Sequence, residues 1–218
     1  FSCRNGGSKK KLDQFIHVSA LGIEEATDSN YALSKLNGEK KVRENFSRSV
    51  ILKPSIVYSV DDNFTTNFMN LLSVLPIMPL YYGGKTKFTP IHVSDFSNII
   101  YEVIKKKISG ETLECIGPEV FTFKEMLLKI LKSINKKRLL LPIPFFLAKL
   151  NAKLFQLMPK PLITLDQLKL LKYDNIISKK YKTNYDLKME ANKKFEEEIN
   201  RYSFNWTSGG QFSKKIDK

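Results

Sequence analysis

The stretch "QFIHVSALGIEEATDSNYALSKLNGEKKVRENFSRSVILKPS" (residues 14–55) decides the fold of this chain. Apolar runs that contain β-branched residues stand at its two ends, at 14–20 and 49–55, and Pro54 stops the second run. The residues between them, at 29–45, repeat their apolar side chains at the spacing of a helix. Two buried strands joined by a helix predict a right-handed crossover between parallel strands.

The middle segment has two further marks of an amphipathic helix. Ser29 or Asn30 stands at its start, where a short polar side chain caps a helix by accepting a hydrogen bond from a free backbone N–H. Four apolar residues predict the face that packs on the sheet: Ala32, Leu33, Leu36 and Val42. We therefore expect one face of this helix to be buried.

Beyond residue 55 strands and helices continue to alternate, less regularly. Helical spacing predicts helices at 63–75, 94–107, 122–134, 145–158, 164–174 and 186–202. A turn that leads into a short strand is expected within 81–93, a strand at 111–117 and an extended segment at 138–144. The alternation indicates an α/β protein with a parallel sheet, followed by a mostly helical carboxyl-terminal part.

The charge balance is strongly basic. Lysine and arginine total 36 against 22 acidic residues, which gives a formal net charge of +14. Such a balance favours an anionic partner, which is nucleic acid, a membrane surface or an acidic protein. The lysines are spread along the chain, without an arginine cluster interleaved with aromatic residues and without zinc-finger spacing. Nucleic-acid binding is therefore disfavoured.

Metal-binding and membrane-spanning patterns are also weak. Two cysteines are too few for a disulfide framework or a metal cluster, and His17 and His92 lie in apolar runs without a partner at ligand spacing. No metal site is expected, and we interpret both histidines as structural. The apolar stretches at 68–84 and 139–161 are broken by prolines or lysines, so neither matches a span of about 20 apolar residues.

A tyrosine four residues before a lysine occurs twice, as Tyr31–Lys35 and Tyr101–Lys105. At this spacing the two side chains share a helix face, and the lysine charge favours the phenolate that acid–base chemistry needs. Around the first pair, the preceding strand ends at Ser19 and the following strand ends in "KPS", where ligands of open α/β sheets bind. Tyr101 instead stands within an apolar stripe and is explained by packing. Context favours the first pair.

Four stretches carry a family resemblance: "HVSALG" (17–22), Tyr31-x-x-x-Lys35, "LKPSIVY" (52–58) and "FTPIHVSDFSNII" (88–100). Together they resemble the latter half of an extended or atypical short-chain dehydrogenase/reductase. Three further stretches narrow it: "SVDDNFTTNF" (59–68), "GPEVFTFKEML" (117–127) and "TLDQLKLLKYDN" (164–175). They resemble the family of NADPH-binding accessory subunits of respiratory complex I and their bacterial relatives.

The resemblance implies a set of site residues. Tyr31 and Lys35 are expected to contact the nicotinamide ribose of NADP or NAD, and Pro54, Ser55 and Ile56 are expected to line the nicotinamide site. For a catalytically active protein, Tyr31 would be the acid/base and Lys35 the partner that lowers its pKa.

Ser19 is the expected carbonyl-polarising hydroxyl of an active enzyme. The extended enzymes carry two or three successive Ser/Thr residues where this chain reads "VSA", which puts Ala20 in the place of the usual hydroxyl. This departure favours a bound cofactor that serves structure or assembly over one that is turned over.

The phosphate-binding part of the family pattern has no counterpart here. The family's G-x-x-G-x-x-G loop does not occur, and Gly6-Gly7 follows no strand. The chain begins with Phe1, in what reads as mid-fold, so we expect an incomplete Rossmann-like sheet whose amino-terminal strands and glycine loop are missing. Dinucleotide binding is expected to need that missing part.

The expected organisation has three parts. Residues 1–120 form the latter half of a Rossmann-like NAD(P)-binding domain, 121–177 a helical region on the substrate or partner side, and 178–218 a polar helical tail. Within 144–158, apolar residues face one side of a predicted helix, which either packs on its own domain or docks on complex I subunits or a membrane surface. The resemblance implies a cytoplasmic location, or a peripheral one on the inner face of a respiratory membrane, the matrix side in a eukaryote.

Three acidic residues receive local interpretations. Ser94 or Asp95 is expected to begin the helix at 94–107, with the Asp95 carboxylate stabilising the first free N–H groups. Asp61 and Asp62 are interpreted as turn residues rather than cation ligands.

Three functions stay open: the cofactor-binding accessory protein, an active NAD(P)-dependent reductase, epimerase or dehydratase, and a basic module that binds nucleic acid or membranes.

Overall fold

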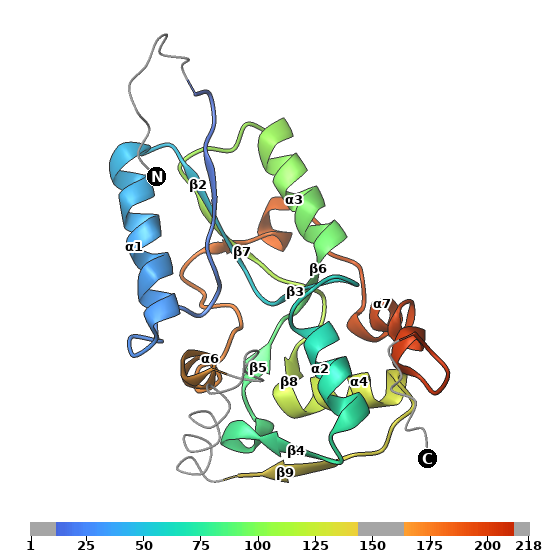
Figure 1. The fold of residues 1–218 in the computed structure, drawn as a ribbon. Coiled ribbons are helices and arrows are strands. Elements are labelled where there is room, and N and C mark those ends of the chain that lie inside the picture. The colour runs from blue at the N-terminus through green and yellow to red at the C-terminus, as the bar shows by residue number, and fades with distance from the viewer. Residues whose placement is uncertain (1–11, 144–163, 212–218) are drawn as a thin grey trace, which may run out of the picture.

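A parallel sheet forms the centre of the molecule (Figure 1). The computed structural model describes residues 12–143 and 164–211. Four strands pair in the order β1-β2-β7-β10, all parallel: β1 (Ile16–Val18), β2 (Val50–Pro54), β7 (Thr112–Cys115) and β10 (Lys182–Thr183). The predicted α/β class with a parallel sheet is therefore confirmed.

Two long helices cover the sheet. Helix α1 (Asn30–Asn45) connects β1 to β2, as the sequence predicts, and α3 (Val93–Lys105) precedes β7. Figure 1 shows α1 and α3 on opposite sides of the sheet. All five residues of β2 are buried between them, which agrees with a central strand of a doubly covered sheet.

Helix α1 begins as predicted but turns a different face inward. The Ser29 hydroxyl accepts a hydrogen bond from the Ala32 N–H at 3.2 Å, which confirms the predicted cap. Ala32 is fully buried, whereas Leu33 is 42% exposed, so its predicted inward position is wrong. The inward face carries Lys35 and Glu39 as well as apolar residues, because a polar cluster lies beneath this helix.

Shorter elements build the second half of the fold. Strands β3 (Val57–Tyr58) and β6 (Ile91–His92) pair in parallel, as do β4 (Ile77–Leu80) and β9 (Leu139–Pro142), while β5 (Lys87–Phe88) and β8 (Phe121–Thr122) pair antiparallel. The helices here are α2 (Thr65–Val74), α4 (Phe123–Ser133), α6 (Leu165–Leu170) and α7 (Phe195–Asn200), with 3-10 turns η1 (Tyr81–Gly84), η2 (Tyr185–Leu187) and η3 (Ser203–Trp206).

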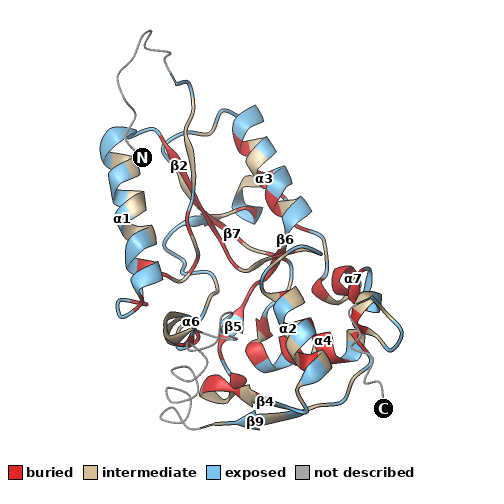
Figure 2. Ribbon diagram, viewed as in Figure 1, coloured by how far each residue is buried: buried red, intermediate tan, exposed pale blue. Residues whose placement is uncertain are grey.

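Two large hydrophobic clusters hold these layers together, and a third, small one of Ile23, Ala26 and Ala32 lies at the start of α1. One lies between the sheet and α3 and includes Leu52, Ile99 and Leu113. The larger one gathers side chains of α2, α4, α7 and η3, from Tyr58 to Trp206. Figure 2 shows the buried residues concentrated along β2 and β7 and in α4 and α7. Each cluster therefore joins segments that are far apart in the sequence.

The predicted helix at 186–202 is wrong over its first half. The chain leaves the sheet at β10, makes the short turn η2 and reverses at Lys188, whose φ is 54°. Asn184 holds this turn, because its side chain accepts from the Ile116 N–H at 2.8 Å and donates to the Met189 carbonyl at 3.0 Å. Met189 is thereby buried under the sheet, and a helix begins only at Phe195.

The predicted helix at 145–158 and the docking surface predicted at 144–158 both lie outside the described residues. Among the helices that are described, none has the length and apolar character to cross a membrane.

Candidate functional site

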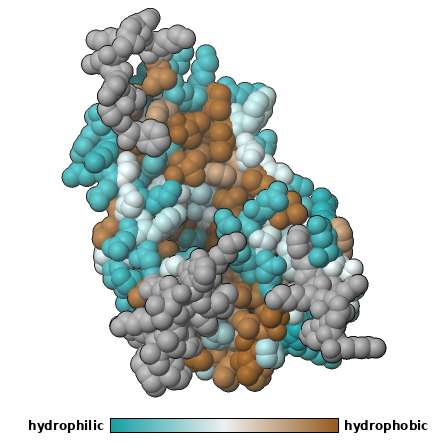
Figure 3. All heavy atoms as spheres, in the orientation of Figure 1, coloured by the Kyte–Doolittle hydropathy of each residue, from teal (hydrophilic) through white to brown (hydrophobic). Residues whose placement is uncertain are grey.

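A cavity of about 640 Å³ lies where β1 and β2 end, between α2 and α6. Of the six residues predicted for the site, it brings together five: Ser19, Tyr31, Pro54, Ser55 and Ile56. In the described part of the chain, Lys35 is not among the lining residues. Figure 3 shows the surface hollowed in this region, with hydrophobic atoms deep in the hollow.

Hydrogen bonds between the strand ends shape the upper rim of this cavity. The Ser19 N–H donates to the Leu52 carbonyl at 2.8 Å, and the Leu21 N–H donates to the Pro54 carbonyl at 2.9 Å. The two loops that leave β1 and β2 therefore run side by side at the carboxyl ends of parallel strands. This edge is where open α/β sheets place their ligands.

The start of α1 is fixed at the cavity by a residue from α6. The Asp166 carboxylate accepts hydrogen bonds from the N–H groups of Asn30 and Tyr31, both at 2.9 Å, and from the Ser29 hydroxyl at 3.0 Å. Burial alone would raise the pKa of Asp166, but these hydrogen bonds outweigh it, and the pKa is lowered. A carboxylate at a helix amino terminus is stabilised in this way, and here it holds Tyr31 in place.

The Tyr31–Lys35 pair has the local geometry that its spacing predicts. The Lys35 Nζ lies 5.8 Å from the centre of the Tyr31 ring and donates to the Val18 carbonyl at 3.3 Å, so it is held at the end of β1. Burial raises the pKa of the Tyr31 phenol above its ordinary value. The direction is opposite to the lowered pKa expected for an acid–base tyrosine.

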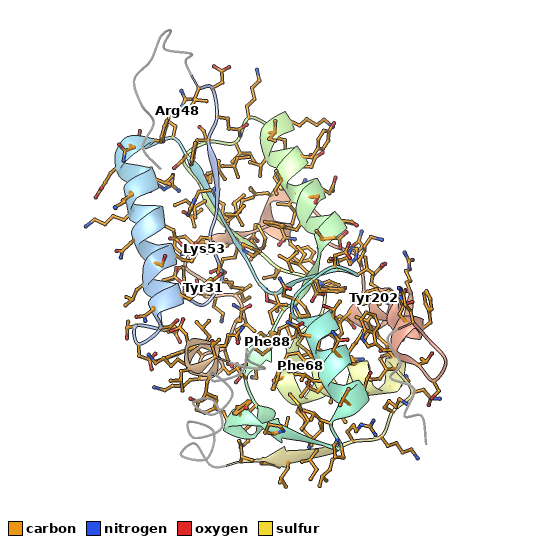
Figure 4. All side chains as sticks on the ribbon, viewed as in Figure 1. Tyr31, Arg48, Lys53, Phe68, Phe88 and Tyr202 are labelled. Atoms are coloured by element: carbon orange, nitrogen blue, oxygen red, sulfur yellow. The ribbon has the colours of Figure 1, made fainter. Side chains whose placement is uncertain are left out.

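Ser19 belongs to a buried polar cluster beneath α1. Its hydroxyl donates to Glu39 Oε1 at 2.5 Å, and Glu39 Oε2 lies 3.0 Å from Lys53 Nζ. Lys53 also pairs with Glu24, and its side chain is only 1% exposed. Burial would lower the pKa of Lys53, but the two glutamates outweigh it and raise it. Figure 4 shows Lys53 of β2 beside α1, close to Tyr31.

This cluster decides which way the Ser19 hydroxyl can act. A carboxylate only accepts hydrogen bonds, so the single proton of Ser19 is committed to Glu39 and its lone pairs remain for a ligand. Such a hydroxyl accepts from a ligand rather than polarising a carbonyl by donation.

Asn175 ties the two strand-end loops to the segment after α6. Its Oδ1 accepts from the Ser55 hydroxyl at 2.5 Å, and its Nδ2 donates to the Leu21 carbonyl at 2.5 Å. Its own N–H donates to the Lys87 carbonyl at 2.7 Å.

Four residues of the site have no role predicted from the sequence: Asp166, Asn175, Glu39 and Lys53. The available signal was the "TLDQLKLLKYDN" stretch, which contains the first two.

The structure shows the roles of two acidic residues that the sequence predicts near helix starts, Asp62 and Asp95. Asp62 accepts from the N–H groups of Phe64 and Thr65, both at 2.5 Å, as a turn residue does. At α3, however, the cap is the His92 ring, whose Nδ1 accepts from the Ser94 N–H at 3.3 Å. Asp95 lies in the first turn of α3, as predicted, but its carboxylate accepts from the Lys193 N–H at 2.9 Å, so His92 rather than Ser94 or Asp95 is the cap.

The other histidine, His17, has a packing role. His17 lies beneath α1 at Gly38, and its Nε2 has no hydrogen-bond partner among the described residues. Burial lowers the pKa of His17, and the nearby Lys35 charge lowers it further. No group of histidine, cysteine or acidic side chains in residues 12–143 and 164–211 is arranged to hold a metal ion.

Known proteins place this geometry in context. No family model matches the chain. It is 29% identical over 168 residues to NADH dehydrogenase [ubiquinone] 1 alpha subcomplex subunit 9 of Mus musculus, covering 76% of this chain and 45% of that protein. It is 25% identical over 189 residues to the NADH-ubiquinone oxidoreductase 40 kDa subunit of Neurospora crassa, covering 84% and 48%. The chain thus spans less than half the length of these relatives.

Among solved structures, UDP-glucuronic acid 4-epimerase from Bacillus cereus has a similar fold, with a TM-score of 0.60 and 20% identity. The similarity covers 89% of this chain and 62% of the epimerase. Sequence and fold agree with the resemblance drawn from the motifs: the chain is similar in sequence to these mitochondrial complex I subunits, and its Rossmann-like α/β fold is similar to that of the NAD-bound epimerase.

Proposed function

We propose that this protein is an NAD(P)-binding accessory subunit of respiratory complex I, whose bound cofactor serves structure or assembly. The observation that carries the proposal is the meeting of Ser19, Tyr31 and the Pro54–Ile56 segment at one cavity, at the carboxyl ends of β1 and β2. Homology to complex I subunits supports the partner, and the fold of NAD-bound epimerases supports the cofactor.

The lining fits the nicotinamide end of the dinucleotide. Tyr31 would hydrogen-bond the nicotinamide ribose, with Lys35 behind its ring, and Pro54, Ser55 and Ile56 would lie along the nicotinamide. The pyrophosphate needs other residues, because no lysine or arginine lines the described cavity and the sequence contains no G-x-x-G-x-x-G loop. Bound NAD(P) would supply hydride chemistry in an active relative.

The hydrogen bonds of the site favour a retained cofactor over turnover. A raised pKa keeps the Tyr31 phenol protonated at neutral pH, which suits a steady hydrogen bond and disfavours proton exchange. The Ser19 hydroxyl donates its hydrogen bond to Glu39, and the Ser55 hydroxyl donates its hydrogen bond to Asn175. The competing proposal is an active reductase, epimerase or dehydratase that uses Tyr31, Lys35 and Ser19.

The test uses the protein expressed from its complete natural reading frame. We expect about one NAD(P) per chain in the extract of the purified protein, and no change in its redox state over hours. Tyr31→Phe should keep the protein in complex I, with Tyr101→Phe as the matched control. Absence of extractable dinucleotide would contradict cofactor binding, and loss of cofactor oxidation in Tyr31→Phe alone would favour the active enzyme.

The partner proposal has a separate test. On native gels, the tagged protein should migrate with NADH dehydrogenase activity, and migration only as a free protein would contradict the assignment. Docking through 144–158, whose sequence predicts a helix with an apolar face and with Lys149 and Lys153 on the other face, is our proposal for the contact with complex I subunits or the membrane surface. Failure to sediment with anionic liposomes would remove the membrane contact.

The division of the chain at 120 and 177 is kept as a proposal. Limited proteolysis of the full protein should then cut first near these positions, and early cuts elsewhere in the described residues would contradict it.

A further inference from the structure

We propose that the inner part of the cavity binds a neutral ligand with a long apolar chain and a hydroxyl at one end, of the long-chain alcohol class. The inference deepens the proposed function, on which it rests for placing the nicotinamide at the Tyr31 end.

Helix α2 provides a mainly apolar wall, in which Asn63 and Asn67 are the polar members. Phe64, just before the helix, Phe68, Leu71 and Leu75, just after it, follow one another at helical spacing and line the cavity. All four are only partly buried, although Phe64, Phe68 and Leu71 pack against the larger core cluster. They therefore present apolar surface to the cavity that the protein's own described residues leave uncovered.

The aromatic side chains of this wall are held by their neighbours. The Phe68 ring lies edge-on to Phe64 at 5.0 Å and to Phe123 at 5.3 Å between ring centres. Phe64 also contacts Phe88 at 6.3 Å. Figure 4 shows Phe68 and Phe88 close together beside α2, away from Lys53. Rings fixed by such contacts keep the cavity open instead of collapsing into it.

The opposite side and the base are also largely apolar. Leu170 and Leu171 line the cavity at the end of α6, and Met78, Pro79 and Tyr81 line it from β4 and η1. A cavity of about 640 Å³ with such walls lies within the usual range of roughly 300–1,000 Å³ for sites that bury a small ligand.

The charges of the lining select against anions. No lysine or arginine lines the cavity within the described residues, whereas Asp166 and Asp174 do. A phosphate or carboxylate inside it would lose water without gaining a counter-charge and would face two carboxylates. The site is therefore unsuited to a nucleoside diphosphate sugar or a fatty acid, and suited to an uncharged chain.

The polar end of the cavity matches a hydroxyl. The Ser19 hydroxyl donates its hydrogen bond to Glu39, so towards a ligand it accepts one. The protonated Tyr31 phenol donates a hydrogen bond to the ligand. A ligand hydroxyl donates and accepts at once, so it satisfies both residues, whereas a carbonyl satisfies only the donor. Chain and head group together indicate an alcohol.

Calorimetric titration of the full natural protein with decanol, decanoate and UDP-glucose tests the inference. We expect saturable decanol binding, with decanoate and UDP-glucose at least about tenfold weaker, because burying a charge without a partner is costly. Each methylene removed from the alcohol should weaken binding about fourfold. Absence of saturable decanol binding, or equal binding of decanoate, would overturn the proposal.

Two variants on α2 locate the site. Leu71→Trp fills the cavity and should weaken decanol binding about tenfold or more, while Val74→Trp, at a position 52% exposed on the same helix, should leave it unchanged. Phe68→Ala enlarges the cavity and should shift the preference towards longer alcohols, so the test survives if Leu71→Trp fails to fold. Equal effects of Leu71→Trp and Val74→Trp, with unaltered thermal melting, would contradict the site.

The dinucleotide assay separates the two proposals. Extractable dinucleotide without decanol binding overturns this inference and leaves the proposed function standing. Decanol binding that depends on Leu71, in a protein without dinucleotide, supports the apolar site and overturns the proposed function.

Discussion

The two tyrosine–lysine pairs of this chain have the same local geometry and different surroundings. Lys35 Nζ lies 5.8 Å from the Tyr31 ring on α1, and Lys105 Nζ lies 5.7 Å from the Tyr101 ring on α3. Tyr31 nevertheless lines the cavity at the strand ends, whereas Tyr101 is 57% exposed and is not among the cavity's lining residues, so the packing predicted for Tyr101 is wrong. The spacing is a property of any helix. What makes a site is the sheet edge that the topology places beside it.

The two helices also differ in what lies beneath them. Helix α3 covers apolar side chains of the sheet, such as Val50 and Leu52, whereas α1 covers Lys53 with its two glutamates. The cluster under α1 fixes the Ser19 hydroxyl, so on this side the core and the site share residues. Predictions about the two sides can therefore be made in matched pairs.

The largest effect is expected from Lys53→Met. Removing the ammonium leaves Glu24 and Glu39 without their shared partner in a buried position, which should lower the free energy of unfolding by about 3 kcal/mol. Urea denaturation measures this change. The matched change on the other helix is Lys105→Met, whose side chain is 62% exposed, and it should cost less than about 0.5 kcal/mol. Equal losses in both variants would contradict the difference between the two sides.

A smaller effect is expected where α6 caps α1. Asp166→Asn removes the charge and one of the two acceptor oxygens that three donors share, and it should lower the free energy of unfolding by about 1–2 kcal/mol. Asp61→Asn, at an exposed turn residue, is the control and should be nearly neutral.

The same variant has a pH signature. The pKa of Asp166 is lower in the folded protein than its ordinary value of 3.8, so its stabilisation is fully present above that value. It is lost as the pH falls through the lower, folded pKa. The difference in stability between the wild type and Asp166→Asn should therefore narrow below about pH 4. A difference that stays constant down to pH 2 would show that the charge of Asp166 is irrelevant.

The smallest stability effect belongs to the tyrosines themselves. Tyr31→Phe and Tyr101→Phe each remove one hydroxyl near the surface and should change the free energy of unfolding by less than about 0.5 kcal/mol. Thermal melting checks both. The two variants should not differ in thermal stability, and a loss of stability in Tyr31→Phe alone would show that the phenol supports the fold.

The sequence predicts what depends on neighbours along the chain. The unit β1-α1-β2 and the Ser29 cap both follow from local patterns and are present. So does the meeting of Ser19, Tyr31 and the Pro54–Ile56 segment, because strand ends converge in a parallel sheet.

Long-range contacts account for what the sequence does not predict. A lysine is normally expected at the surface, and only two distant glutamates make Lys53 a core residue. Asp166 reaches α1 across 135 residues, and Asn175 reaches Leu21 across 154. Strand β10 has two residues in a polar segment, so its pairing with β7 leaves no local pattern.

Hydrogen–deuterium exchange of the full natural protein, with and without NADPH, tests the central claim most directly. We predict protection at the ends of β1 and β2 and in the first turns of α1, around Ser19, Tyr31 and Ser55, with α3 unchanged around Tyr101. Unchanged exchange at these three positions under saturating NADPH, or protection at Tyr101 instead, would contradict the assignment of the Tyr31 cavity as the dinucleotide site.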